Sequence, residues 1–401
     1  MKRSLFDKER HEALGVVRWD QAAARRAIAT IVRDAEVRFS PDGLWPVHPL
    51  DCDDGPRSEP STSLYVGAAG VICGLDFLAR RGLAGSTARF APVLAVLEER
   101  NRREREAGGW GRESYLAGCS GVLLTRYRLA PSHETADRLA RSIGINTDHP
   151  TRELMWGAPG TMHAALAMHE WTGEERWVDL YRSGARSLAA SLERHGDCEL
   201  WTQDIWRRRL VMLGAAHGYA GNAGAILRGI ALLAEAERGA WIERIVSAAR
   251  ATALRDGPFA NWPAEDLRAG SDSKMLLQWC HGAPGFVTGL ATLDDPRLDD
   301  LLLAAGELIW AAGPLAKGGG LCHGTAGNGY AFLKLYVRTA EERWLDRARA
   351  FAMHAIAQCE RDVALYGMRR YSLYTGDPGI AIYLMQCIDG TAVWPGLDPE
   401  S

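Results

Sequence analysis

The sequence of 401 residues predicts an all-α protein made of seven helical hairpins that close into a ring. Two observations lead to this prediction: the motif G-x-x-G recurs, and an apolar helical run follows it. The seven copies begin at Gly67, Gly118, Gly157, Gly218, Gly282, Gly324 and Gly376. One element repeated at intervals of this size is typical of a protein assembled from one supersecondary unit.

Each motif predicts the start of a helix. Three copies, GAPG twice and GDPG once, carry proline in the third place, where its missing N–H and fixed φ suit the first turn of a helix. After the sixth copy, Phe332, Leu333 and Tyr336 fall on one helical face. The motifs therefore predict seven helices, which we call the inner helices.

A second helix is expected to follow in each unit. Thr172 and Thr339 both stand 15 residues after the first glycine of their motif, and each begins a T-x-E-E-R-W-x-D segment. The spacing of Thr172 with Glu175, and of Thr339 with Glu342, predicts a capping box at a helix start. An apolar stripe over residues 344–355 then marks the buried face of the second helix. The predicted unit is a helical hairpin.

Seven hairpins can stack as an open solenoid or close into a ring with one helix of each pair inside. We favour the ring, because glycine at a helix start lets neighbouring backbones approach closely. A ring would also bring all seven helix starts to one mouth. We assign residues 64–401 to the ring and residues 1–63 to an N-terminal helix, over about 20–38, and a loop packed on it, as one domain overall.

Composition and charge restrict the function. The chain has 47 Lys and Arg residues against 50 Asp and Glu, a net charge of −3, so nucleic acid is not an expected partner. The N-terminal sequence has no apolar run after its basic start, and we expect a cytoplasmic protein without a membrane partner. Eight scattered cysteines favour free thiols or a metal site over a disulfide framework.

One charged run remains open to two interpretations. The segment 206–209, Trp-Arg-Arg-Arg, lies just before the fourth motif. Such a run is usually a solvated surface and less often a contact for an anion.

The residues directly before the motifs would stand together at the mouth of the ring. Histidine holds this position in motifs four, five and six, as His217, His281 and His323, and cysteine precedes two of them, as Cys280 and Cys322. Taken singly, each cysteine is equally a small buried hydrophobe and each histidine a hydrogen-bonded interior residue. Their repetition favours a metal site, because two thiolates and one imidazole hold zinc with an open fourth position. Symmetry alone does not decide between His281 and His323.

An open zinc position binds water or the thiol of a substrate. A soft site with two sulfur ligands accepts a further thiolate. Zinc deprotonates a thiol that it coordinates, whereas a free thiol, with a pKa of about 8.5, is mostly protonated at neutral pH. The predicted site is therefore suited to activating a thiol nucleophile.

At these motifs the sequence resembles the lanthionine synthetase C-like (LanC-like) family, from about Tyr65 to Leu384. The resemblance implies an α/α toroid of seven inner and seven outer helices, with Zn²⁺ at its centre held by Cys280, Cys322 and His323. The segments that carry it are Asn261-Trp-Pro, Gln278-Trp-Cys-His-Gly-Ala-Pro-Gly, Lys317-Gly-Gly-Gly-Leu-Cys-His-Gly, Leu213-Gly-Ala-Ala-His-Gly and Ser372-Leu-Tyr-Thr-Gly-Asp-Pro-Gly.

The resemblance also implies a reaction. Family members add a thiol to the β-carbon of dehydroalanine or dehydrobutyrine and form a thioether by Michael addition. His217 matches the family histidine proposed as the general acid or base. Glu153 falls where peptide cyclases carry an assisting aspartate. A carboxylate that satisfies backbone N–H groups at a helix start is an equally good interpretation of Glu153.

Two residues bear on which thiol is used. Peptide cyclases usually carry tyrosine at the position of His281, while the glutathione-using branch of the family carries histidine. Lys317 matches a lysine of that same branch. The functional role of Lys317 would be a cation for an enolate oxygen or a glutathione carboxylate, and the alternative is a solvated loop residue.

We therefore expect a zinc enzyme that adds glutathione, or a similar thiol, to a dehydroamino acid in a peptide or protein. His217, Lys317 and Glu153 are the expected catalytic residues, and His281 and Lys317 the expected substrate contacts. Two alternatives stay open. One is a lanthipeptide cyclase that forms intramolecular lanthionine rings, and the other is a regulatory protein that binds zinc and glutathione without turnover.

Overall fold

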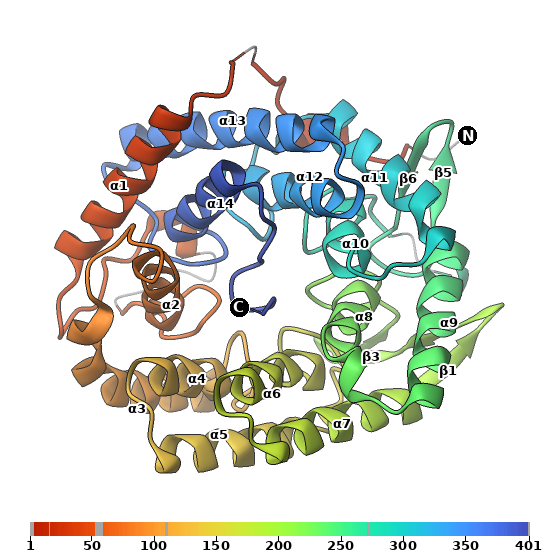
Figure 1. Cartoon of the computed structure of the whole chain (residues 1–401), viewed down its shortest axis with the longest axis horizontal. Coiled ribbons are helices and arrows are strands. Elements are labelled where there is room, and N and C mark those ends of the chain that lie inside the picture. The colour runs from red at the N-terminus through yellow and green to blue at the C-terminus, as the bar shows by residue number, and fades with distance from the viewer. Residues whose placement is uncertain (1–3, 16, 53–58, 109–110, 271–272, 400–401) are drawn as a thin grey trace.

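The computed structural model describes residues 4–15, 17–52, 59–108, 111–270 and 273–399. This part of the chain forms fourteen α-helices and six short strands. The helices close into a ring of two layers (Figure 1). The predicted α/α toroid is confirmed. In the described part of the chain, no helix combines the length and the apolar character needed to cross a lipid bilayer.

The inner layer contains seven helices, each of which begins directly after the first glycine of a G-x-x-G motif. They are α2 (Ala68–Ala79), α4 (Cys119–Leu129), α6 (Ala158–Thr172), α8 (Tyr219–Arg228), α10 (Ala283–Leu290), α12 (Thr325–Thr339) and α14 (Asp377–Asp389). The second glycine is required by a close approach, because a Cβ at Gly327 would lie 1.8 Å from the carbonyl oxygen of Leu321. The turn that precedes each inner helix thus packs directly on the first turn of that helix, where only glycine leaves enough space.

The outer layer covers the inner one. It consists of α1 (Gln21–Arg38), α3 (Ala91–Gly108), α5 (His133–Asn146), α7 (Glu175–Ala190), α9 (Glu235–Thr252), α11 (Asp299–Ala312) and α13 (Glu342–Tyr366). Six of these helices follow an inner helix in the chain, as the hairpin model predicts.

The seventh outer helix comes from the other end of the chain. The sequence predicts that residues 1–63 pack on a ring made of residues 64–401. In the structure, α1 is itself part of the outer layer and lies against α14 and α13 (Figure 1). The described residues after α14 form no further helix. The apolar face of α1, which includes Ile28, Ile31 and Val32, is buried in this contact and closes the ring.

The capping boxes predicted at Thr172 and Thr339 are wrong. Both threonines end an inner helix, and their hydroxyls donate to the carbonyl four residues earlier, at 2.7 Å for Thr172 and 2.8 Å for Thr339. Each hydroxyl also accepts the N–H two residues later, at 3.2 Å. The outer helices still begin at Glu175 and Glu342, so the pattern located the helix starts but not the bonds that make them.

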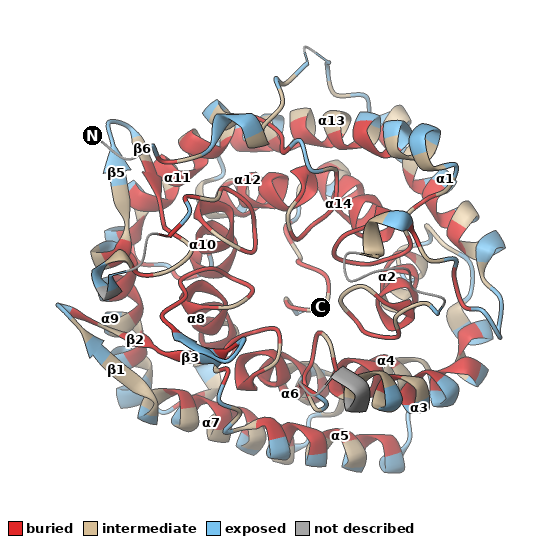
Figure 2. Cartoon of the chain, turned by 180° about the vertical axis from the view of Figure 1, so that it is seen from behind, coloured by how far each residue is buried: buried red, intermediate tan, exposed pale blue. Residues whose placement is uncertain are grey.

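Three antiparallel strand pairs were not predicted. They are β1 (Leu192–His195) with β2 (Cys198–Trp201), β3 (Gln203–Ile205) with β4 (Arg208–Leu210), and β5 (Leu254–Asp256) with β6 (Phe259–Asn261). In the second pair, Gln203 faces Leu210 and Ile205 faces Arg208. The turn between β1 and β2 points away from the ring while β2 packs against α9, and β3 lies over the inner layer beside α8 (Figure 2).

Backbone hydrogen bonds join the turns that precede the inner helices into a circle, which we call the turn ladder. Its members stand two positions before each motif: Tyr65, Leu116, Met155, Ala216, Cys280, Cys322 and Tyr374. The N–H of one member donates to the carbonyl of its equivalent in the next repeat. Six such bonds, 2.8–3.4 Å long, run from Met155 round to Leu116. Side chains at equivalent positions of adjacent repeats are therefore held next to each other.

The chain after α14 returns to the centre of the ring (Figure 1). In this C-terminal tail, residues 391–399, the indole of Trp394 stacks on Trp279 with ring centres 4.8 Å apart. The hydroxyl of Tyr115 donates to the carbonyl of Gly396 at 2.6 Å. Because Trp279 directly precedes a member of the turn ladder, the tail fills the interior beneath the ladder.

Candidate metal centre and active site

A candidate metal site lies where two adjacent turns meet. One donor atom from each of Cys280, Cys322 and His323 lies within 4.8 Å of the other two. Both cysteines are buried members of the turn ladder, and the N–H of Cys280 donates to the carbonyl of Cys322 at 3.1 Å. His323 is half-buried. Two sulfurs and one imidazole nitrogen at this spacing fit a single tetrahedral ion, and they are a donor set that zinc prefers.

The two thiols affect each other. A hydrogen bond from Cys322 lowers the pKa of Cys280 well below its ordinary value. Burial raises the pKa of Cys322. One thiol of the pair thus loses its proton easily while the other keeps it, and a bound divalent cation would favour the deprotonated form of both.

Neighbouring side chains hold the sulfur atoms in place. Gln278 Nε2 donates to Cys280 Sγ at 2.9 Å, and Arg10 donates to Gln278 Oε1 at 3.0 Å. A hydrogen bond from Tyr65 opposes the effect of burial on the pKa of Cys322. Sequence reasoning assigned no role to Tyr65 or Arg10. Tyr65 could have been found, because it holds the same position before its motif as the two cysteines do.

Glu153, in the turn before the third motif, and His217, in the turn before the fourth, form a pair. His217 Nδ1 lies 3.0 Å from Glu153 Oε2. The Glu153 carboxylate is fully buried and also accepts the N–H groups of Met155 and Trp156, at 2.8 Å each. Glu153 therefore does both things that the sequence left open, since it satisfies backbone donors and also contacts the histidine.

His281 lies on the other side of His217, with ring centres 6.2 Å apart. Its Nδ1 is buried and has no hydrogen-bond partner among the described residues. Burial lowers the pKa of His281, so the imidazole is neutral at neutral pH. The Nδ1 atom is enclosed beside Gly214, where a Cβ would lie 2.8 Å from it, so a substrate meets only the part of the ring that remains exposed.

Lys317 lies near the metal site but remains exposed. It lines a cavity of about 20 Å³ together with His323, Asp362 and Arg370. Burial dominates the raised pKa of Cys322, and the charge of Lys317 acts against it. The structure thus brings the seven predicted site residues to one mouth.

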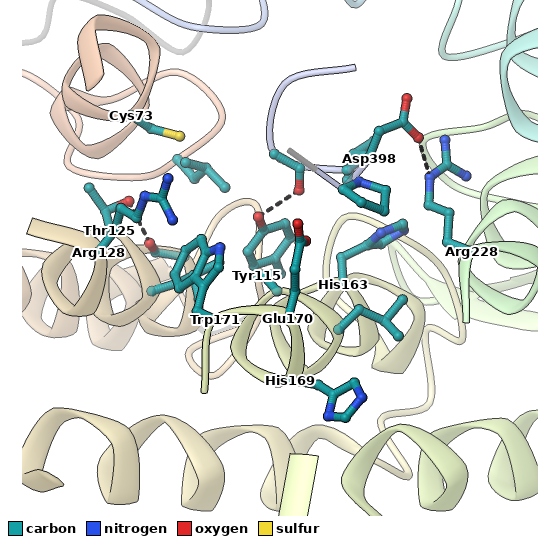
Figure 3. A pocket seen from close by; sticks show the side chains of 18 of the residues that line it. Cys73, Tyr115, Thr125, Arg128, His163, His169, Glu170, Trp171, Arg228 and Asp398 are labelled. Carbon is teal, nitrogen blue, oxygen red and sulfur yellow. Dashed lines mark hydrogen bonds and ion pairs between the residues drawn. The ribbon is translucent and has the colours of Figure 1, made fainter. Parts of the chain in front are cut away.

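A second cavity, of about 280 Å³, lies where α2, α4, α6 and α8 end (Figure 3). Its buried charges are already paired, because Asp398 of the tail binds Arg228 at 2.5 Å and Lys334 at 2.6 Å. Burial lowers the pKa of His163 beside them to about 3. Within the described ranges, the only cluster of three or more Cys, His, Asp or Glu residues suited to a metal is the one at the mouth.

Residues 50–398 match the family model described as lanthionine synthetase C-like protein. The chain is similar to Glutathione S-transferase LANCL1 of Danio rerio, with 44% identity over 88 residues, which are 21% of this chain and 22% of that protein. It is also similar to LanC-like protein GCL1 of Arabidopsis thaliana, with 30% identity over 247 residues, which are 57% of this chain and 53% of that protein. The matched regions thus span less than two thirds of either relative.

Among solved structures, nisin cyclase has a similar fold. Its TM-score is 0.61 at 14% sequence identity, over 93% of this chain and 96% of that one. At this identity the likeness shows the toroid and carries no conclusion about the reaction.

Proposed function

This chain belongs to the lanthionine synthetase C-like family, and from that premise we propose that it adds a thiol to the β-carbon of dehydroalanine or dehydrobutyrine in a peptide or protein. The product is a thioether. The observation that carries the proposal is the cluster of Cys280, Cys322 and His323 beside the pair of His217 and Glu153. We assign glutathione, or a similar small thiol, as the nucleophile, and the name of the relative from Danio rerio supports that class.

The donor set of the cluster fits zinc. When bound there, the ion would supply a Lewis acid that keeps the thiol of the substrate deprotonated at neutral pH. Gln278 and Tyr65 would keep the two cysteine sulfurs in position, as residues around a metal's ligands commonly do.

Addition of a thiolate to the β-carbon leaves an enolate, whose α-carbon must then receive a proton. We assign this proton transfer to His217. With Nδ1 turned to Glu153, Nε2 is the nitrogen left to exchange a proton with the substrate. Glu153 cannot turn away easily, because its two oxygens also accept backbone N–H groups. It is therefore a positioning residue for His217.

Lys317 and His281 are assigned to the substrates. The exposed ammonium of Lys317 is free to approach an enolate oxygen or a carboxylate of glutathione, and it would stabilise the negative charge of either. The half-buried ring of His281 lies beside Cys280 and 6.2 Å from the ring of His217, where a bound thiol would meet it. These two residues favour an external thiol over a cysteine of the acceptor peptide, which a lanthipeptide cyclase would use.

The test is an incubation of the zinc-loaded protein with glutathione and a dehydroalanine peptide, followed by mass spectrometry of the adduct. We expect a zinc-dependent adduct that disappears in Cys322→Ala. Cys52→Ala, which changes a cysteine outside the cluster, should keep the activity. If the wild type binds zinc but forms no adduct with any thiol, the enzymatic proposal fails and a regulatory role replaces it. Ring closure within a peptide that carries its own cysteine, without reaction of glutathione, would identify a cyclase instead.

A further inference from the structure

The strand pair β3–β4 places an exposed aromatic ring and unpaired positive charge at the mouth. We propose that this hairpin is the docking site for the acceptor chain and that it selects acidic peptide segments around the dehydroamino acid. The inference rests on the proposed function, since it assigns the second substrate of the same reaction. It also decides between the two interpretations of residues 206–209, in favour of an anion contact.

The turn of this hairpin is built from residues that do not favour it. Trp206 and Arg207 connect β3 to β4 with φ angles of +52° and +59°. A two-residue turn with both φ angles positive normally holds Asn-Gly, because a side chain is disfavoured in that region. Strained residues of this kind collect at functional sites, where the surrounding structure holds them in place. The same turn could be made by Asn-Gly at a lower conformational cost, so the fold of the hairpin does not explain why Trp206 and Arg207 stand there.

The hairpin is fixed to the turns that carry Glu153 and His217. The N–H of Asp204 donates to the carbonyl of Pro150 at 3.1 Å, and Arg152 donates to the carbonyl of Thr202 at 3.0 Å. On its inner side, Ile205, Leu210 and Met212 form a small apolar cluster against Trp156. The tip of the hairpin is thus held at a set position beside the candidate proton donor.

Trp206 is exposed although it lies in this fixed setting. Its side chain is 53% exposed, and its ring meets His217 edge-on with centres 5.3 Å apart. The ring of Trp156 lies 6.2 Å from that of Trp206 and 5.1 Å from that of His217, so the three rings form a triangle. Exposed tryptophans at the edge of a site are frequent anchors for a bound chain, because they offer a large rigid surface. A peptide lying across Trp206 would bring its neighbouring residue to His217.

The charge of the tip indicates what kind of peptide fits. Arg209 already has a carboxylate partner, because it binds Glu193 at 3.2 Å. Arg207 and Arg208 are exposed and have no carboxylate partner within the described part of the chain. Two free guanidinium groups beside an aromatic platform favour carboxylates of aspartate or glutamate on the bound chain. We therefore assign the acceptors to acidic peptide segments.

Binding can be measured without catalysis. The probe is a fluorescein-labelled peptide in which serine stands in for the dehydroamino acid, flanked by two glutamates on each side, and the matched probe carries glutamines instead. Fluorescence anisotropy should show the acidic probe binding about tenfold more tightly at low salt, and high salt should reduce the difference. In the double variant Arg207→Gln, Arg208→Gln, we expect the two probes to bind about equally. Trp206→Ala should weaken both by about tenfold or more.

The control is Arg194→Gln, which removes an exposed arginine from the neighbouring hairpin β1–β2 and should change neither affinity. Circular dichroism of every variant checks that the fold is kept. Equal binding of the two probes to the wild type, or an unchanged preference in the double arginine variant, would overturn the inference. The outcome is separate from that of the proposed function, which is decided by adduct formation with a minimal N-acetyl dehydroalanine amide that has no flanking residues.

Discussion

The two ends of the same inner helices differ in how their buried polar groups are satisfied. At the mouth, where the helices begin, the buried Cys280 and Cys322 bring two sulfurs close enough to share one ion with His323. At the other end, where four of the helices finish, Asp398 of the tail lies between Arg228 and Lys334. The donor atoms at the mouth are placed to bind a ligand, whereas the buried charges at the far end bind one another. Substitutions at the mouth should therefore change the reaction, and those at the far end should change stability.

The strongest test of this difference is Cys322→Ala. The variant should lose bound zinc and slow adduct formation by about 10⁴-fold, because the Lewis acid supplies several kcal/mol to the transition state. Zinc content by atomic absorption and adduct rate by mass spectrometry measure the two effects. An active variant with a full zinc content would place the metal elsewhere.

At the far end, Asp398→Asn should act on the fold. The pKa of Asp398 is raised by burial, but the charges of Arg228 and Lys334 outweigh burial and hold it below its ordinary range. Without the carboxylate two buried cations lose their partner, so the free energy of unfolding should fall by about 3–5 kcal/mol. Urea denaturation measures this loss. The control Asp389→Asn, at an exposed aspartate of α14, should cost less than about 0.5 kcal/mol.

Zinc content tells whether the two ends are independent. Asp398→Asn should still bind zinc with the stoichiometry of the wild type under native conditions. Loss of the metal in this variant would mean that the tail, through Trp394 and Trp279, is needed to form the mouth.

A third substitution separates proton transfer from metal binding within the mouth. His217→Asn should slow the adduct reaction by about 10²-fold, which is typical for the loss of a general acid or base. Zinc content and unfolding free energy should stay close to those of the wild type. His133→Asn, at an exposed histidine of the outer layer, is the matched control and should leave the rate unchanged. A rate for His217→Asn equal to that of this control would remove His217 from the mechanism.

Counted per pH unit, the smallest expected effect is on the pH dependence of stability at the far end. Burial lowers the pKa of His163 to about 3, whereas in the unfolded chain it is about 6.5. Between these values only the unfolded state binds the proton, so stability falls as the pH is lowered from about 6.5 toward 3, by up to about 1.4 kcal/mol per pH unit. His163→Asn should reduce this slope by that amount in urea denaturation at several pH values. An identical slope in both proteins would show that His163 is already protonated in the folded state.

The inner layer could be predicted because its signal is local. The second glycine of each motif is demanded by a contact with a carbonyl six residues earlier, as at Gly327 and Leu321, so the sequence marks every copy. Five of the seven predicted site residues follow from that same repeat, because they stand one or two positions before a motif: Cys280, Cys322, His217, His281 and His323. The choice of His323 over His281 and the role of His217 also needed the family resemblance, because the repeat alone leaves the histidines equivalent. Glu153 and Lys317 were predicted from the resemblance alone.

Contacts between distant parts of the chain, and turns made by unfavourable residues, have no local sequence pattern from which they could be predicted. Nothing in the residues of α1 indicates that its partner is α14, at the far end of the chain. The turn of β5–β6 is Gly257-Pro258, with glycine at the first central position and a φ angle of +57°, and this local hairpin signal was missed. The turn of β3–β4 contains Trp206 and Arg207, which no turn preference would select. The element that we assign to the acceptor was therefore the hardest to predict.

We propose that equivalent turns of adjacent hairpins hold one zinc ion with room for a thiol. X-ray absorption at the zinc edge of the wild-type protein measures this directly. We predict two sulfurs at about 2.3 Å and a nitrogen at about 2.0 Å around the metal, with a third sulfur when glutathione is added. A shell without two sulfurs, or one that glutathione leaves unchanged, would contradict the account.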